Sequence, residues 1–268
     1  MSADELRVAE RSATELLELL WRDHTVVSPH CARIHQLLTE RGELLVHDHL
    51  ALSTFAMPAL GLDALARPFE ARGWQRREQR CPDGDHLRAG AWHHPDPSVP
   101  KLVLSELAID ALSPAAQATI GRLVGQLPAD FSMRDDAMWA GRPWQLCLAD
   151  YQALAAESPH AAWIAAFGLR VHHFAVDLDS LEAFPDLEAF AAFLSDHGFK
   201  LDDANGVIQG SPAEWLEQLA TRHATAVVAF SDTTARIPGF RYHAARRYPL
   251  PSGERFAGFW GISSASPA

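Results

Sequence analysis

The sequence predicts an α+β fold in which two βαβββ modules enclose a shared cavity. Two stretches, residues 46–55 and 169–176, combine β-branched and aromatic residues with histidines, which is the pattern of a buried strand that carries imidazole side chains. Each stretch precedes an amphipathic helical segment that ends in glycine, at residues 62–73 and 187–198. The same order at matched spacing indicates that the strand-helix unit is duplicated.

The chain is expected to begin with a helical segment, residues 1–45. Apolar residues, including Leu16, Leu17 and Leu20, recur at helical spacing between residues 9 and 21. A second helix is predicted after Ser28-Pro29, because serine caps a helix and proline fits its first turn; this helix would end near Gly42.

The first module is assigned to residues 46–110, with further strands at 74–80, 87–93 and 101–107 separated by turns such as 81–84. Residues 111–165 are predicted to form a helical connector that opens at Ser113-Pro114. The second module, residues 166–262, is predicted to contain a strand at 170–178, a helix at 187–197 and strands at 207–209, 225–230 and 240–246. The small, polar tail at 263–268 is expected to fray.

Composition argues against several classes of partner. The 268 residues are 48% hydrophobic, and 34 Asp and Glu against 23 Lys and Arg give a net charge of −11. This balance disfavours nucleic acids and anionic membranes and favours a small polar substrate. The three cysteines, Cys31, Cys81 and Cys147, form no pair with metal-ligand spacing. The acidic N-terminus does not resemble a signal peptide, and no apolar run reaches the roughly 18 residues that a membrane-spanning helix needs. We therefore expect a cytoplasmic protein.

Histidines and one glutamate mark the expected cavity. Paired βαβββ modules are the layout of vicinal-oxygen-chelate metalloenzymes, in which residues from the first and last strands of each module hold a metal. The candidates on those strands are His47, His49, His172, His173, Glu106 and His243. In regular strands, only one of His172 and His173 can face the cavity, whereas His47 and His49 share a face.

Three of these histidines form the predicted metal site, namely His49, His173 and His243. Imidazoles on rigid strands suit iron(II) with open positions for substrate and oxygen, and they equally suit a catalytic zinc. Glu106 is a candidate further ligand or a buried catalytic acid that bonds a ligand or the substrate. His160, His223 and most of the remaining histidines are interpreted as structural or solvent-exposed.

Over residues 28–265 the chain resembles the 2-oxoadipate dioxygenase/decarboxylase family, a branch of the vicinal-oxygen-chelate superfamily. The matching segments are residues 48–55, 104–107, 157–163, 168–176 and 208–212, with shorter matches at 216–218, 237–239 and 258–259. The resemblance implies an iron(II) site with ligands at His49 and His173. The family's glutamate ligand falls on His243, so the expected two-histidine, one-carboxylate site becomes a three-histidine site.

The resemblance also implies the activity, an iron(II)-dependent dioxygenase/decarboxylase that uses dioxygen to convert a 2-oxo acid, or a related chelating acid, into a hydroxylated product. Where the family carries an arginine four residues after the first histidine, this chain has Ser53, so a dicarboxylate substrate is in doubt. Arg241 is the candidate replacement. Ser211 and Gln218 match positions that line the second module and are candidate substrate contacts.

Two other functions stay open at this point. One is a non-redox metal-dependent isomerase, lyase or hydrolase with Glu106 as general base. The other is a non-catalytic protein that binds a small molecule and whose metal site has decayed. The sequence does not indicate an oligomeric state.

Overall fold

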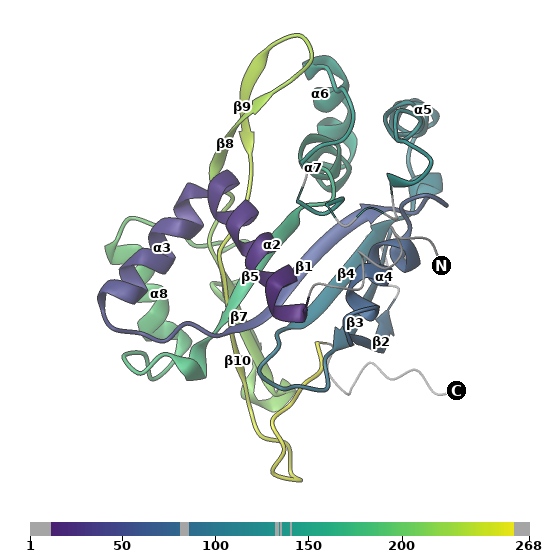
Figure 1. The fold of residues 1–268 in the computed structure, drawn as a ribbon. Helices are drawn as coiled ribbons and strands as arrows, with labels where there is room; N and C mark the ends of the chain where they lie inside the picture. The colour runs from purple at the N-terminus through teal and green to yellow at the C-terminus, as the bar shows by residue number, and fades with distance from the viewer. Residues whose placement is uncertain (1–11, 81–85, 132–133, 135, 140, 260–268) are drawn as a thin grey trace.

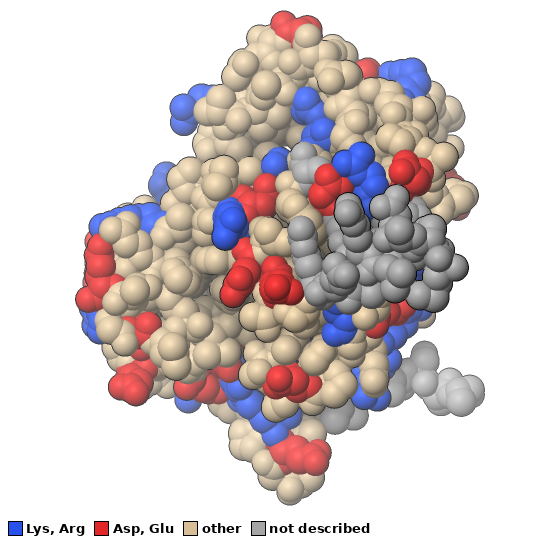
Figure 2. Space-filling view, viewed as in Figure 1, with Lys and Arg blue, Asp and Glu red and all other residues tan. Residues whose placement is uncertain are grey.

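The fold was analysed in a computed structural model that describes residues 12–80, 86–131, 134, 136–139 and 141–259 (Figure 1). The turn predicted at 81–84 lies outside the described residues, as does the tail at 263–268. In the described part of the chain, no helix combines the length and apolarity needed to cross a membrane. Figure 2 shows Lys and Arg interspersed with Asp and Glu over the face in view.

Most of the elements follow the predicted order. The first half contains α2 (Ala13–Val27), α3 (Pro29–Glu40), β1 (His47–Phe55), α4 (Leu62–Glu70), β2 (Gln75–Arg80), β3 (Leu87–His93), β4 (Lys101–Leu107) and α5 (Pro114–Val124). The second half contains α6 (Leu148–Glu157), α7 (Pro159–Phe167), β5 (Val171–Asp177), α8 (Leu187–Asp196), β6 (Ile208–Ser211), β7 (Leu216–Ala220), β8 (Thr225–Ala229), β9 (Thr234–Pro238) and β10 (His243–Arg247).

Eight strands form one curled sheet in the order β2-β3-β4-β1-β5-β10-β7-β6. From the centre of the sheet outward, the strands of the first half are β1, β4, β3 and β2, and those of the second half are β5, β10, β7 and β6. Each half therefore places its first strand innermost, followed by its last, its third and its second. β1 pairs parallel with β4, β5 pairs parallel with β10, and β1 and β5 pair antiparallel where the halves meet. The predicted α+β fold with two βαβββ units is therefore confirmed, and the first strand of each unit lies at the centre of the sheet.

One strand of the second module was predicted wrongly. β8, expected as a strand of the module, pairs only with β9 in a separate two-stranded sheet. The strand that completes the module is β7, which pairs with β10 and β6. Its sequence, Leu216–Ala220, is short and half polar, so its pattern gives a weak strand signal, whereas the β-branched run of β8 gives a strong one. The β8–β9 hairpin is thus an insertion between β7 and β10.

The N-terminal helices pack on the sheet face opposite the predicted cavity. A capping box between Ser12 and Glu15 starts α2. Leu16 and Leu20 of α2 join the core that contains Leu50 and Leu52 of β1. α3 instead packs with α8 in a second apolar cluster, and Figure 1 shows these two helices side by side.

The connector helices α6 and α7 stand with the β8–β9 hairpin at one end of the molecule (Figure 1). Ser158 caps α7 by accepting a hydrogen bond from the Ala161 amide at 3.1 Å, and α7 ends at Gly168. Gly168 has φ +74°, and a Cβ atom there would lie 2.9 Å from the Gly141 carbonyl oxygen. Only glycine meets both demands, and this tight turn leads the chain directly from α7 into β5.

Candidate metal centre

Three histidines from three central strands lie on the same face of the sheet. His49 of β1 and Ala175 of β5 are register partners, as are His243 of β10 and the same Ala175. His173, two residues earlier on β5, shares that face. The ring centroids of His49 and His173 are 5.5 Å apart, and those of His173 and His243 are 3.6 Å apart. The structure thus brings together the three histidines predicted as ligands.

His49 is held by a buried charged network. Its Nδ1–H donates a hydrogen bond to Oδ2 of Asp48 at 2.7 Å, which fixes the tautomer and leaves Nε2 as the donor atom for a metal. Asp48 also accepts hydrogen bonds from Arg247 at 2.6 and 2.9 Å and lies 3.5 Å from the Lys101 ammonium. Burial alone would raise the pKa of Asp48. The hydrogen bond from His49 and the charge of Arg247 outweigh burial and hold this pKa well below its usual value.

His173 and His243 stack face to face with planes within 7° of parallel. Burial, together with neighbouring histidines, lowers the pKa of both well below 6.5, so both rings are neutral near pH 7. Neutral imidazole is the form that binds a metal. Among the described residues, His243 Nε2 is one of a few buried side-chain atoms without a hydrogen-bond partner.

These observations test whether the site suits iron. Within the described ranges, no three His, Cys, Asp or Glu side chains are arranged to hold a metal ion as they stand. The donor set nonetheless fits. Three adjacent neutral imidazoles, one with an unsatisfied buried Nε2 and one oriented by a carboxylate, are the side chains that a divalent iron or zinc binds.

Two bulges overturn the predictions from regular strand alternation. A register shift opposite Ala51 and Leu52 leaves His172 as the extra residue of β5, and both His172 and His173 line the same cavity. Another shift at the start of β1 separates His47 from His49. The His47 ring contacts Trp21 and Phe174 on the α2 side of the sheet, at centroid distances of 4.8 and 4.9 Å.

A cavity of about 790 Å³ lies over the His173 end of the site. Its floor is the sheet, and its wall comes from α6, α7 and the hairpin. The lining residues are Ala51, Ser53, Val103, Ser105, Tyr151, Ala155, Pro159, His160, Ala162, Trp163, His172, His173, His223, Pro238 and Arg241. This volume falls within the usual range of small-molecule sites.

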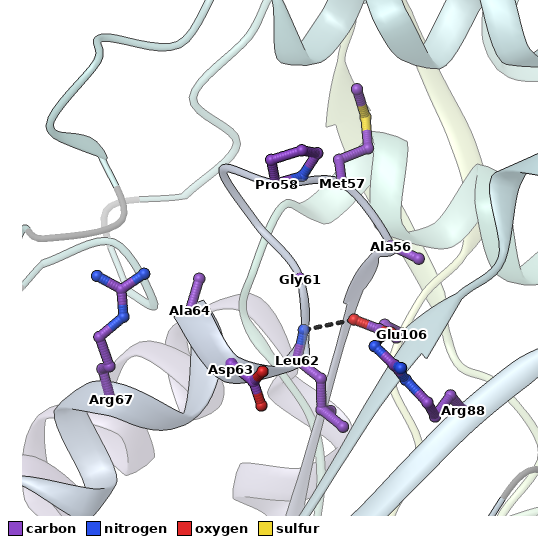
Figure 3. A pocket seen from close by; sticks show the side chains of 10 residues that line it. All are labelled: Ala56, Met57, Pro58, Gly61, Leu62, Asp63, Ala64, Arg67, Arg88 and Glu106. Carbon is purple, nitrogen blue, oxygen red and sulfur yellow. Dashed lines mark hydrogen bonds and ion pairs between the residues drawn. The ribbon is translucent and has the colours of Figure 1, made fainter.

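Glu106 is not part of this cavity. Thr54, not Ser53, is its register partner on β1, so Glu106 points to the opposite face of the sheet. There its carboxylate accepts a hydrogen bond from the Leu62 amide at the start of α4 and forms an ion pair with Arg88 (Figure 3). The structure therefore places Glu106 apart from the three histidines, in a separate pocket.

The four predicted substrate contacts divide into two pairs. Ser53 and Arg241 line the cavity. Ser211 lies on the outermost strand, where its hydroxyl donates to Glu214 at 3.0 Å. Gln218 of β7 pairs with Ala245 and so faces the same side as His243, but it is not among the cavity-lining residues.

Several site residues were not predicted as such. Asp48 and Ser105 adjoin residues that were singled out, His49 and Glu106, and their positions follow from strand register. His160 and His223, interpreted as structural or solvent-exposed, line the cavity. Trp163 was predicted only as an aromatic anchor of the connector. Its location in the cavity wall depends on how α7 packs on β1, which no local pattern reveals.

Comparison with known proteins supports the resemblance. The sequence pattern that defines the 2-oxoadipate dioxygenase/decarboxylase family matches residues 136–247. A curated relative from Oryza sativa subsp. japonica, the chloroplastic/amyloplastic 2-oxoadipate dioxygenase/decarboxylase, is 28% identical over 228 residues. The match covers 78% of this chain and 62% of the relative, so this chain spans about three fifths of that protein's length.

Solved structures share the whole fold. A protein from Shewanella frigidimarina NCIMB 400, named provisionally as a hydrolase, is 37% identical with a TM-score of 0.88, covering 94% of this chain and 98% of that one. Hydroxyglutarate synthase from Oryza sativa, solved with 2-oxoadipate, is 25% identical with a TM-score of 0.83, covering 96% and 89%. A protein from Ralstonia eutropha JMP134, provisionally named as a member of the glyoxalase superfamily, shares the fold. It is 19% identical with a TM-score of 0.74, covering 93% of this chain and 86% of that one. The predicted vicinal-oxygen-chelate fold is confirmed.

Proposed function

We propose that the chain, which matches the 2-oxoadipate dioxygenase/decarboxylase family over residues 136–247, is an iron(II)-dependent dioxygenase acting on a 2-oxo acid or a related chelating acid. The observation that carries the proposal is the convergence of His49, His173 and His243, of which His173 also lines a cavity of substrate size. These residues come from the first strand of each module and the last strand of the second.

Iron bound by these imidazoles would supply open coordination positions for a 2-oxo acid chelate and for dioxygen. The protein contributes orientation and protection. Asp48 holds His49 in one tautomer, and Arg247 and Lys101 balance the charge of Asp48 within the protein. The lining of the cavity is rich in apolar side chains, which exclude water from the reacting end of the substrate.

The proposed reaction is balanced by dioxygen alone. A 2-oxo acid and dioxygen give carbon dioxide and a 2-hydroxy acid that is one carbon shorter. The bond between C1 and C2 breaks, and C1 leaves with its own two oxygen atoms. C2 becomes the new carboxyl carbon, and a hydroxyl replaces a hydrogen on the former C3. Both atoms of dioxygen therefore end in the product, one in the carboxylate and one in the hydroxyl, and dioxygen is the only oxidant required.

Metal content and gas exchange test the proposal together. The protein purified without air should contain stoichiometric iron, and 2-oxo acids should then drive oxygen uptake and carbon dioxide release in equal amounts. The His243→Ala variant should lose the iron. His223→Ala is the matched control, since His223 lines the same cavity but its Nδ1 bonds the Gly239 carbonyl at 2.8 Å; it should retain iron. Absence of oxygen uptake with every 2-oxo acid tested would refute the proposal.

The non-redox alternative depends on Glu106 as a general base beside the metal. Because Glu106 lies on the other face of the sheet, bonded to the Leu62 amide and Arg88, no observation here favours that alternative.

A further inference from the structure

We propose that the substrate is a 2-oxo monocarboxylic acid with an uncharged, mainly apolar side chain; this inference rests on the function proposed above. The cavity that receives the side chain of the substrate extends from His173 past Ala51 to Ser53. Ser53 lies four residues beyond His49 on the same strand, which corresponds to roughly 13 Å at about 3.3 Å per residue. The groups that line this length determine which side chains are accepted.

The floor of the cavity offers one neutral hydrogen-bonding unit. Ser53 and Ser105, on neighbouring strands, have hydroxyl oxygens 2.8 Å apart. One hydroxyl hydrogen is used in this mutual bond, so the pair has a single hydrogen left to donate. It can bond a carbonyl or hydroxyl group of a ligand, but it carries no charge to neutralise a second carboxylate.

The one arginine that lines the cavity is already neutralised. The Arg241 guanidinium forms an ion pair with Asp202, and its Nε–H donates to the Thr221 carbonyl at 3.1 Å. Among the lining residues that the structure describes, no other side chain is an arginine or a lysine. A second carboxylate in the substrate would therefore have to compete with Asp202 for the same cation.

Besides His173, three histidines line the cavity, His160, His172 and His223, and the last two each have a ring nitrogen within hydrogen-bond distance of another group of the protein. His172 Nδ1 lies 2.9 Å from His173 Nδ1, within hydrogen-bond distance. His223 Nδ1 donates to the Gly239 carbonyl at 2.8 Å, which leaves only Nε2 for a ligand.

The upper wall presents apolar surface. Trp163 Nε1–H donates to the Gly239 carbonyl at 3.0 Å, so its ring contributes carbon atoms to the cavity. Ala155 and Ala162 in the wall, with Val103 on the floor, complete a lining suited to hydrocarbon groups. A carboxylate buried against the carbon face of the Trp163 ring would lose its hydration without gaining a partner there, whereas a methyl group at the same position would gain from burial.

Two acids of equal length test the inference. 2-Oxohexanoate and 2-oxoadipate differ only in a terminal methyl or carboxylate group. Binding to the iron-loaded protein is measured without air by titration calorimetry, and turnover by oxygen uptake. We expect 2-oxohexanoate to bind about tenfold or more tightly than 2-oxoadipate and to have the higher kcat/KM, since tenfold corresponds to only about 1.4 kcal/mol.

Two variants should reverse the preference by adding an unpaired cation. Ser53→Arg places a guanidinium on the floor, and Asp202→Asn releases Arg241 from its ion pair. Both should tighten 2-oxoadipate binding without improving 2-oxohexanoate binding. Ser53→Gln controls for side-chain size, and Asp203→Asn, which breaks the neighbouring surface pair with Arg222, controls for a lost surface charge. Neither control should shift the preference.

The outcomes separate this inference from the proposed function. If both acids are turned over but 2-oxoadipate binds as well or better in the wild-type protein, the inference is wrong and the dioxygenase function stands. If the two cation-adding variants leave the preference unchanged, the charge argument is wrong. If no 2-oxo acid drives oxygen uptake, the proposed function fails and the inference fails with it.

Discussion

Nδ1 of His49 and Oδ2 of Asp48, side chains of consecutive residues on β1, lie 2.7 Å apart. In a regular strand these side chains would point to opposite faces of the sheet. The bulge at the start of β1 brings them together and lets Asp48 reach Arg247 on β10 as well. The bulge thus creates the carboxylate–histidine pair that orients the first proposed ligand.

Replacing Asp48 should weaken metal binding without removing a ligand. In Asp48→Asn the amide cannot match the charged acceptor for the His49 Nδ1–H, so we expect iron(II) affinity to fall by about 10–100-fold. A competing chelator measures the change. The variant should also melt at a lower temperature, because it leaves the buried Arg247 guanidinium without its carboxylate. Lys101→Met, which removes only the longer 3.5 Å contact, should change affinity less.

Glu106→Gln should affect stability rather than turnover. Its carboxylate accepts from the Leu62 amide and pairs with Arg88, so the neutral variant weakens the link between β4 and the start of α4. We expect a loss of about 1–3 kcal/mol in the free energy of unfolding. Oxygen uptake by the folded variant should stay within about twofold of wild type. A hundredfold loss of kcat with unchanged stability would instead place Glu106 in catalysis.

Acid should destabilise the protein through His24. Burial lowers its pKa from 6.5 to about 3, although the Val171 carbonyl partly offsets this effect. Below pH 6.5 the unfolded chain takes up a proton that the folded chain does not accept until about pH 3. Stability is therefore complete above pH 6.5 and declines as pH falls, by up to about 1.4 kcal/mol per pH unit for this group.

Urea unfolding at several pH values between 7 and 5 measures this slope. His24→Leu keeps an apolar side chain beside Phe174 and Phe240 but cannot titrate, so its slope should be shallower than wild type by up to one proton. Equal slopes in the two proteins would show that other groups, not His24, govern the loss.

Gly168→Ala should be costly for two separate reasons. A side chain is strained at φ +74° and ψ −146°, by about 1–3 kcal/mol, and its Cβ would overlap the Gly141 carbonyl oxygen. Gly42→Ala is the matched control, with φ +86° but no atom within 4 Å of the added Cβ. Chemical denaturation should show the larger loss for Gly168→Ala. Similar losses in both variants would mean that the contact with Gly141 relaxes freely.

Much of the fold could be predicted because it depends on local patterns. The helices at 62–70 and 187–196 have apolar periodicity, and the strands at 75–80, 87–93 and 101–107 are bounded by turn residues. β7 and the β8–β9 pair could not be distinguished in this way. Which of them joins the main sheet depends on pairing with β10, a contact between residues far apart in the chain.

The sequence by itself determined the duplicated βαβββ order, the resemblance to a known family, and the three histidines that lie together at the centre of the sheet. These features are carried by residue identity and spacing. The tertiary structure alone decided which side chains share a face. Bulges turn His47 away and bring His172 and Asp48 to the cavity side, strand register sends Glu106 to the opposite face, and the ion pair with Asp202 neutralises Arg241. The physical reason is that strand alternation has a period of two residues, so one extra residue reverses a side chain, and only pairing between distant strands fixes where that residue falls.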